Sequence, residues 1–143
     1  MNIDAEKTAI QSVLNAARRG LHEKDAAAIG EQFASDAVIF DLAPPLVHGL
    51  DVPGLSAWLD GWDGPVGQEW RDLTIAVDGD IAFCHGLCKM TAMTKADGQH
   101  AQWWQRMTVC FRRVGNRWKI AHEHSSVPFH MDGSFLAATD LQP

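Results

Sequence analysis

The first third of the chain has the hydrophobic spacing of amphipathic helices. Apolar residues recur three and four positions apart, which predicts a helix over residues 4–23 with Asp4 as its N-cap. The same spacing predicts a short helix over 25–33, capped by Asp25, and a third helix over 51–62. These three helices should each bury one apolar face.

Beyond the helices the chain has the pattern of strands joined by tight turns. A first strand is expected at 37–41, and the others at 70–77, 81–94, 100–114 and 117–126. Three residue pairs suited to hairpins separate the later strands: Asp78-Gly79, Asp97-Gly98 and Gly115-Asn116. Two of these strands exceed the usual length, which favours a bent sheet with bulges. Helices followed by strands predict an α+β fold, with three N-terminal helices packed on a strongly curved, mainly antiparallel sheet.

The last hairpin can be registered from its turn. If Gly115 and Asn116 form the turn, Val114 lies opposite Arg117 and strict alternation assigns every later side chain to a face. The more apolar face should then point to the helices, and it carries Met107, Val109, Phe111, Ile120, His122 and His124. On this register Glu123 points to the opposite face, where a cross-strand ion pair with Arg106 is expected.

Composition narrows the function classes. The chain has 143 residues and a net charge of −6, which favours a single soluble domain over 1–143 and argues against a nucleic-acid-binding surface. It shows neither a secretory signal pattern nor an apolar run of membrane-spanning length, so we expect a cytoplasmic protein with no membrane partner. Its three cysteines should be reduced, because Cys84 and Cys88 on one strand lie too far apart to bond.

Three residues are candidates for acid/base chemistry. Asp41 ends an apolar strand, where desolvation would disfavour its charged form and suit it to proton transfer. The alternative is a turn residue before Pro44. His122 and His124 form an H-x-H pair on the expected inner face and could exchange protons with Asp41. They could instead be hydrogen-bonded core histidines, or complete a three-ligand metal site with Asp41, although no recognised metal motif is present.

Aromatic composition points to an apolar ligand. The chain has six Trp, six Phe and no Tyr. Trp58 and Trp62 lie one helical turn apart, and Trp103 and Trp104 must point to opposite faces of their strand. Trp118 is expected in the core. The predicted lining of a ligand pocket is Trp58, Trp62, Ile39, Met107, Val109, His85 and Trp103.

Two stretches carry a resemblance to a known family. The segment KDAAAIGEQFASDAVIFD, residues 24–41, resembles the opening motif of the nuclear-transport-factor-2-like (NTF2-like) superfamily. The segment RMTVCFRRVGNRWKIAHEHSSVPF, residues 106–129, together with the final DLQP, is similar to the end of its ketosteroid-isomerase-homolog or SnoaL-like group. The resemblance covers nearly the whole chain. It implies a cone-shaped α+β barrel and a homodimer formed through the outer face of the sheet.

The resemblance also suggests roles for individual residues. Asp41 matches the position of the proton-shuttling base of ketosteroid isomerase. That enzyme also needs a tyrosine on its first helix, and the matching position here is Ala17. Steroid isomerisation is therefore not expected.

Three hypotheses of function follow. The first is a cofactor-independent isomerase, cyclase or lyase that acts on an apolar, ring-containing molecule, with Asp41 as base and His122 or His124 as acid. The second is a non-catalytic ligand-binding or dimerisation module of the same fold. The third is a metal-dependent enzyme.

Overall fold

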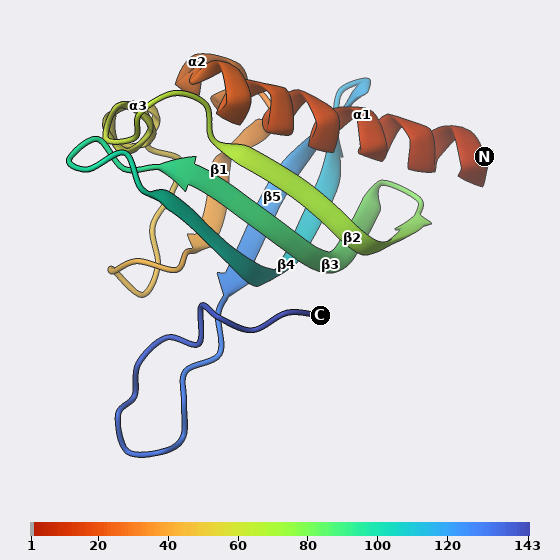
Figure 1. Ribbon diagram of the computed structural model, residues 1–143. Coiled ribbons are helices and arrows are strands. Elements are labelled where there is room, and N and C mark those ends of the chain that lie inside the picture. Colours follow the sequence, from red (N-terminus) through yellow and green to blue (C-terminus); the bar gives the residue numbers. More distant parts are fainter. Residues whose placement is uncertain (1) are drawn as a thin grey trace.

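A computed structural model describes residues 2–143 as helices laid across one face of a curved sheet (Figure 1). The helices are α1 (Ile3–Glu23), α2 (Ala26–Gly30) and α3 (Val52–Asp60). The strands are β1 (Phe33–Phe40), β2 (Gly67–Asp78), β3 (Ile81–Met93), β4 (His100–Val114) and β5 (Arg117–Ser126). This arrangement confirms the predicted α+β class.

The sheet is mixed and open. Its strand order is β1-β5-β4-β3-β2, and all neighbours are antiparallel except β1 and β5, which run parallel. β1 and β2 are the edges, so the sheet curves around the helices without closing into a barrel. The register shifts along β2–β3 and again along β4–β5, and such bulges bend a strand and increase its twist.

Local signals set most of the element boundaries. Asp25 and Asp51 cap α2 and α3 by accepting backbone N–H groups at 3.0 Å from Ala28 and Gly54. The first helix differs from the prediction: Asn2, rather than Asp4, is its N-cap and accepts from the backbone of Ala5 at 3.1 Å. Asn2 and Asp4 are both residue types that can accept from a free N–H group in the first turn of a helix, so the sequence alone does not decide between the two caps.

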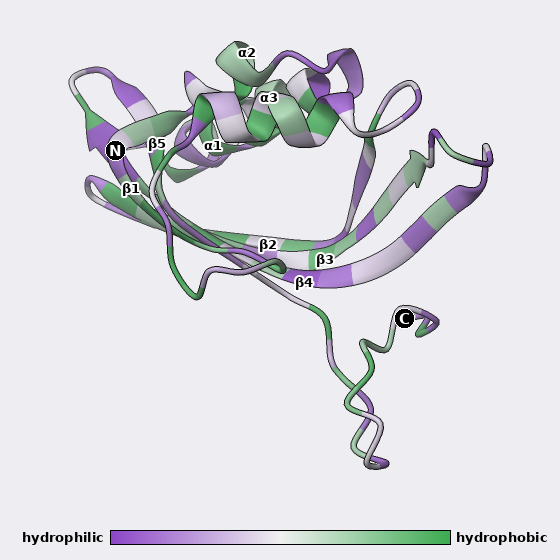
Figure 2. Cartoon of the chain, turned by 90° about the vertical axis from the view of Figure 1, so that its left-hand side faces the viewer, coloured by the Kyte–Doolittle hydropathy of each residue, from purple (hydrophilic) through white to green (hydrophobic). Residues whose placement is uncertain are grey.

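The core lies between the helices and the face of the sheet that they cover, which we call the inner face. Ile10 and Leu14 of α1 and Leu59 of α3 belong to the same buried cluster as Val109 and Phe111 of β4. Figure 2 shows all three helices on this side and the chain after β5 descending on the other, outer side. None of the helices within residues 2–143 has the length and hydropathy that crossing a membrane requires.

Candidate functional site

A cavity of about 660 Å³ lies between the helices and the inner face. Each helix contributes to its wall, and β1 to β5 form its floor. The segment after β1, from Asp41 to Pro45, lines its mouth. A volume of this size suits a small organic molecule.

Four tryptophans form much of the apolar wall. Trp58 and Trp62 of the α3 region meet edge to face with ring centroids 6.0 Å apart, and Trp62 lies 6.4 Å from Trp103 of β4. Trp70 of β2 completes the set. Large flat side chains at these positions would contact a ring-containing ligand on several sides.

The floor of the cavity carries polar groups that are otherwise rare in the core. Gln68, Gln105 and Ser125 are the buried polar residues in the described chain, and all three line the cavity. The Gln105 side-chain oxygen accepts from Trp103 Nε1 at 2.8 Å, which leaves its NH₂ group for another partner. Gln68 Nε2 donates to Met107 Sδ at 3.6 Å, whereas Gln105 and Ser125 keep hydrogen-bonding capacity for a ligand with polar atoms of its own.

Glu123 of β5 is the ionisable group on this floor. It pairs in register with Val109 on one side and Ile39 on the other, both buried residues of the inner face. Burial raises the pKa of Glu123 to about 7, and the negative charge of Asp41 adds to that rise, while His48 acts in the opposite direction. Near neutral pH this carboxyl group can therefore both accept and donate a proton.

Asp41 and His48 form a pair at the cavity mouth. Backbone hydrogen bonds of 2.8 and 3.1 Å join His48 to Ile39, so the loop returns alongside the end of β1. His48 Nε2 lies 3.6 Å from the Asp41 carboxylate, whose side chain is 53% exposed. His48 Nδ1 donates to the carbonyl of Gly49 at 2.7 Å, which orients the ring. Asp41 is thus more exposed than expected, but it faces the cavity.

The two histidines proposed as partners of Asp41 do not face the cavity. The predicted register holds from Val114↔Arg117 to Phe111↔Ile120, and then a bulge at Ala121 brings Cys110 opposite His122. A one-residue bulge exchanges the faces of all later side chains. His122 and His124 consequently lie on the outer face, where His122 Nδ1 donates to the carbonyl of Val38 at 2.6 Å. Their predicted orientation was wrong.

The same bulge reverses the predicted orientation of Glu123. It points inward rather than outward, and Arg106 donates instead to Ser126 Oγ at 3.0 Å, so the expected Arg106–Glu123 pair is absent from the described chain. His85 also lies on the outer face, opposite Thr108, and does not line the cavity. Six predicted lining residues do line it: Ile39, Trp58, Trp62, Trp103, Met107 and Val109.

Sequence reasoning did not identify several residues that the structure places at the cavity. His48 lies in a loop with no periodic pattern, and only its backbone pairing with Ile39 brings it to Asp41. Gln68 and Gln105 had no motif around them, although each sits at an inward position of its strand. Ala17, the position matched to the isomerase tyrosine, does line the cavity.

A shared metal site is not assembled from the proposed ligands. Asp41 faces the cavity, whereas His122 and His124 are on the other side of the sheet. Among residues 2–143, no group of three or more His, Cys, Asp or Glu side chains is placed to hold a metal ion. The cysteines are free, and burial raises the pKa of the Cys84 thiol to about 12.

Comparison with known proteins places the chain in a family. Residues 10–130 match the SnoaL-like domain. An NTF2-like protein of unknown function from Pseudomonas putida superimposes with a TM-score of 0.86 at 27% identity, covering 98% of both chains. A candidate dehydratase of the NTF2-like family from Streptomyces avermitilis gives a TM-score of 0.78 at 14% identity, covering 87% of this chain and 97% of the other.

A candidate scytalone dehydratase from Novosphingobium aromaticivorans gives a TM-score of 0.75 at 13% identity, covering 94% and 92% of the two chains. At such low identity these likenesses concern the fold alone. No curated protein matches the sequence significantly. Because the family match spans most of the chain and the full-length superposition agrees with it, the protein belongs to the SnoaL-like group of the NTF2-like superfamily.

Proposed function

We propose that this protein is a cofactor-independent acid/base enzyme, an isomerase, cyclase or lyase, for an apolar ring-containing substrate. The observation that carries the proposal is Glu123, a carboxyl group with a pKa near 7 on the polar floor of a tryptophan-walled cavity. Titratable groups with displaced pKa values in a cavity are typical of active sites. The candidate dehydratases among the structural neighbours are consistent with this class of reaction.

The arrangement suits proton transfer at a carbon next to a carbonyl group. One carboxylate would remove the proton from carbon, and a protonated group would donate to the oxygen on which negative charge develops. Glu123 lines the cavity, where it is partly buried, and would serve in either protonation state near neutral pH. Asp41 retains its proposed role as base, now with His48 Nε2 at 3.6 Å from its carboxylate in place of a histidine of β5.

The polar floor would hold the substrate oxygen. The free NH₂ group of Gln105 and the hydroxyl of Ser125 lie on the same face as Glu123 and can donate hydrogen bonds to a carbonyl. The tryptophans would contact the ring of the substrate. Proton transfer of this kind involves no electron transfer, so the proposed reaction needs no redox cofactor.

The test is proton exchange at carbon. The protein would be incubated in D₂O with α-tetralone and related bicyclic ketones, and loss of the α-proton signal followed by NMR, with binding followed by quenching of tryptophan fluorescence. We expect exchange in the wild type and at least a hundredfold loss in Glu123→Gln or Asp41→Asn. Glu69→Gln, an exposed glutamate of β2, is the matched control.

The outcomes separate the hypotheses. Exchange that is lost in both site variants and kept in the control supports the acid/base enzyme. Fluorescence quenching without exchange would favour the non-catalytic ligand-binding module, for which the open cavity is the supporting observation. Exchange that survives both substitutions would refute the assignment of Asp41 and Glu123.

We also propose that a second copy covers the outer face, as the family resemblance implies. Large apolar side chains are exposed there on two strands: Val38 and Phe40 of β1, and Ile81 and Phe83 of β3. Phe40 packs edge to face on His122 with ring centroids 4.7 Å apart. Large apolar side chains exposed on one face of a sheet commonly mark a protein–protein interface. Sedimentation equilibrium of the wild type and of Phe83→Glu tests it, and a monomeric wild type would refute it.

A further inference from the structure

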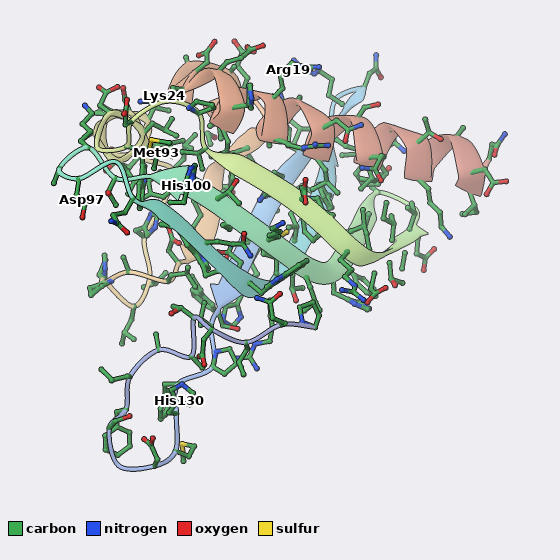
Figure 3. All side chains as sticks on the ribbon, in the orientation of Figure 1. Arg19, Lys24, Met93, Asp97, His100 and His130 are labelled. Carbon is green, nitrogen blue, oxygen red and sulfur yellow. The ribbon has the colours of Figure 1, made fainter. Side chains whose placement is uncertain are left out.

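The segment after β5 is an ordered hairpin that stands away from the body of the protein. We call residues 127–138 the arm. Figures 1 and 2 show it leaving the end of β5 and descending on the outer side of the sheet. Figure 3 places His130 on it, far from the helices. The arm therefore extends from the side that the helices leave open.

Backbone and side-chain hydrogen bonds define the conformation of the arm. Its two runs pair where the N–H of His130 donates to the carbonyl of Leu136 at 2.8 Å and the N–H of Ala138 donates to that of Pro128 at 2.7 Å. At the tip the Asp132 carboxylate accepts from the backbone and hydroxyl of Ser134, at 3.0 and 2.6 Å. These bonds hold the pKa of Asp132 below its usual range.

The arm presents apolar side chains that its own chain does not cover. Met131 is 82% exposed, Phe135 is 68% exposed and Leu136 is 67% exposed, whereas Ala138 is buried. Phe129 lies against Phe135 with ring centroids 5.8 Å apart, yet more than half of Phe129 remains accessible. A two-stranded hairpin is at best marginally stable in water on its own. The exposed side chains therefore indicate a surface that meets another molecule.

The direction of the arm and the charges on the arm and the outer face indicate that the partner is a second copy of this chain. The arm descends on the same side of the sheet as the exposed Phe40 and Phe83, so a copy seated on the outer face would lie beside it. The arm carries one acidic residue, Asp132 at its tip, and no lysine or arginine; Asp140, just beyond it, lies 3.4 Å from His130 of the arm. The outer face carries Lys89 and Arg106, neither of which forms an ion pair within the described chain.

We infer that the arm clasps the partner subunit of a symmetric dimer, with Phe135 and Leu136 packed on the partner's surface. This inference rests on the outer-face dimer proposed above. In a two-fold arrangement each subunit gives and receives one arm, so the apolar surface of both arms is covered. Asp132 at the tip would lie near Lys89 of β3 or Arg106 of β4 in the partner subunit.

The test compares dimer dissociation constants by sedimentation equilibrium. We expect the double variant Phe135→Ser with Leu136→Ser to raise the constant at least tenfold. Because both side chains are exposed in the single chain, circular dichroism at low concentration should be unchanged. Leu46→Ser is the matched control: Leu46 is 95% exposed, apolar and outside the arm, and its loss should leave the constant unaltered. Met131→Ser gives a second, independent arm variant.

A crosslinking experiment locates the contact. Benzoylphenylalanine in place of Phe135 should, on irradiation, link two copies through β3, β4 or β5. If both arm variants dimerise with unchanged affinity, or if crosslinks form only within one chain, the proposed contact of the arm with the partner is refuted. The outer-face dimer would still stand. A wild type that is monomeric at all concentrations would refute both. Crosslinks to lipid vesicles or to unrelated proteins in place of a second copy would also overturn the inference.

Discussion

Replacing Glu123 by glutamine should stabilise the protein at alkaline pH. The wild-type carboxyl group is neutral at low pH and must carry a charge in a partly buried place once it ionises, whereas the amide never does. Its pKa lies at about 7 in the folded protein against an ordinary value of 4.5. That difference corresponds to about 3 kcal/mol in the free energy of unfolding.

The pH dependence follows from where the protons are bound. Below pH 4.5 both the folded and the unfolded states hold the proton, so the two proteins should be about equally stable. Between pH 4.5 and about 7 the unfolded state loses its proton first, and the wild type becomes steadily less stable. Above pH 7 the full difference applies, and a gain of about 3 kcal/mol would raise the melting temperature by roughly 6 to 12 °C.

Urea denaturation followed by tryptophan fluorescence measures this directly. Both proteins would be unfolded at pH 4.5, 6 and 8 at one fixed protein concentration, because any dimerisation also changes apparent stability. Glu69→Gln should change stability by less than about 0.5 kcal/mol at every pH, since Glu69 is exposed. A stability difference for Glu123→Gln that does not grow between pH 4.5 and pH 8 would refute the buried carboxyl argument.

Three further predictions concern the neighbours of this group and the packing of the first helix. Asp41→Asn should lower the pKa of Glu123 without returning it to 4.5, because burial is the larger cause, and ¹³C NMR titration of glutamate carboxyl groups would show the shift. Gln105→Ala should leave the half-buried Trp103 indole without its acceptor and cost about 1 to 3 kcal/mol in urea denaturation; an unchanged midpoint would contradict this. The hydrogen bond from Trp118 Nε1 to Glu6, at 2.7 Å, is the first cause of the lowered pKa of Glu6. Stability from that contact should be present above pH 4.5 and lost as pH falls through the lowered pKa, so Glu6→Gln should be less stable than wild type at pH 7 and no different in strong acid.

Much of the fold could be predicted because its signals are local. Caps, helical spacing and tight turns involve residues within a few positions of one another, so the pattern predicted all three helices and the succession of strands along the chain. Even here the boundaries moved: β1 begins at Phe33, well before the predicted 37, because its early residues pair with the distant β5. The β2–β3 turn is centred on Gly79 and Asp80, one position later than predicted.

The site itself was decided by tertiary structure. Strand alternation predicted the faces of β4 correctly, and with them Met107 and Val109 in the cavity. It failed on β5, because one bulged residue exchanged His122 with Glu123 between the two faces. The long strands indicated that bulges exist, but their positions depend on how the sheet bends over the helices.

The sequence by itself determined the class of fold, the family and the apolar character of the cavity. These follow from periodicities and motifs that survive a shift of a residue or two. Only the tertiary structure decided that Glu123 faces the cavity, that His48 lies beside Asp41, and that the arm leaves Phe135 and Leu136 exposed. The physical reason is that a strand's faces alternate at every residue, so a single irregularity reverses the chemistry presented to the cavity while leaving the fold unchanged.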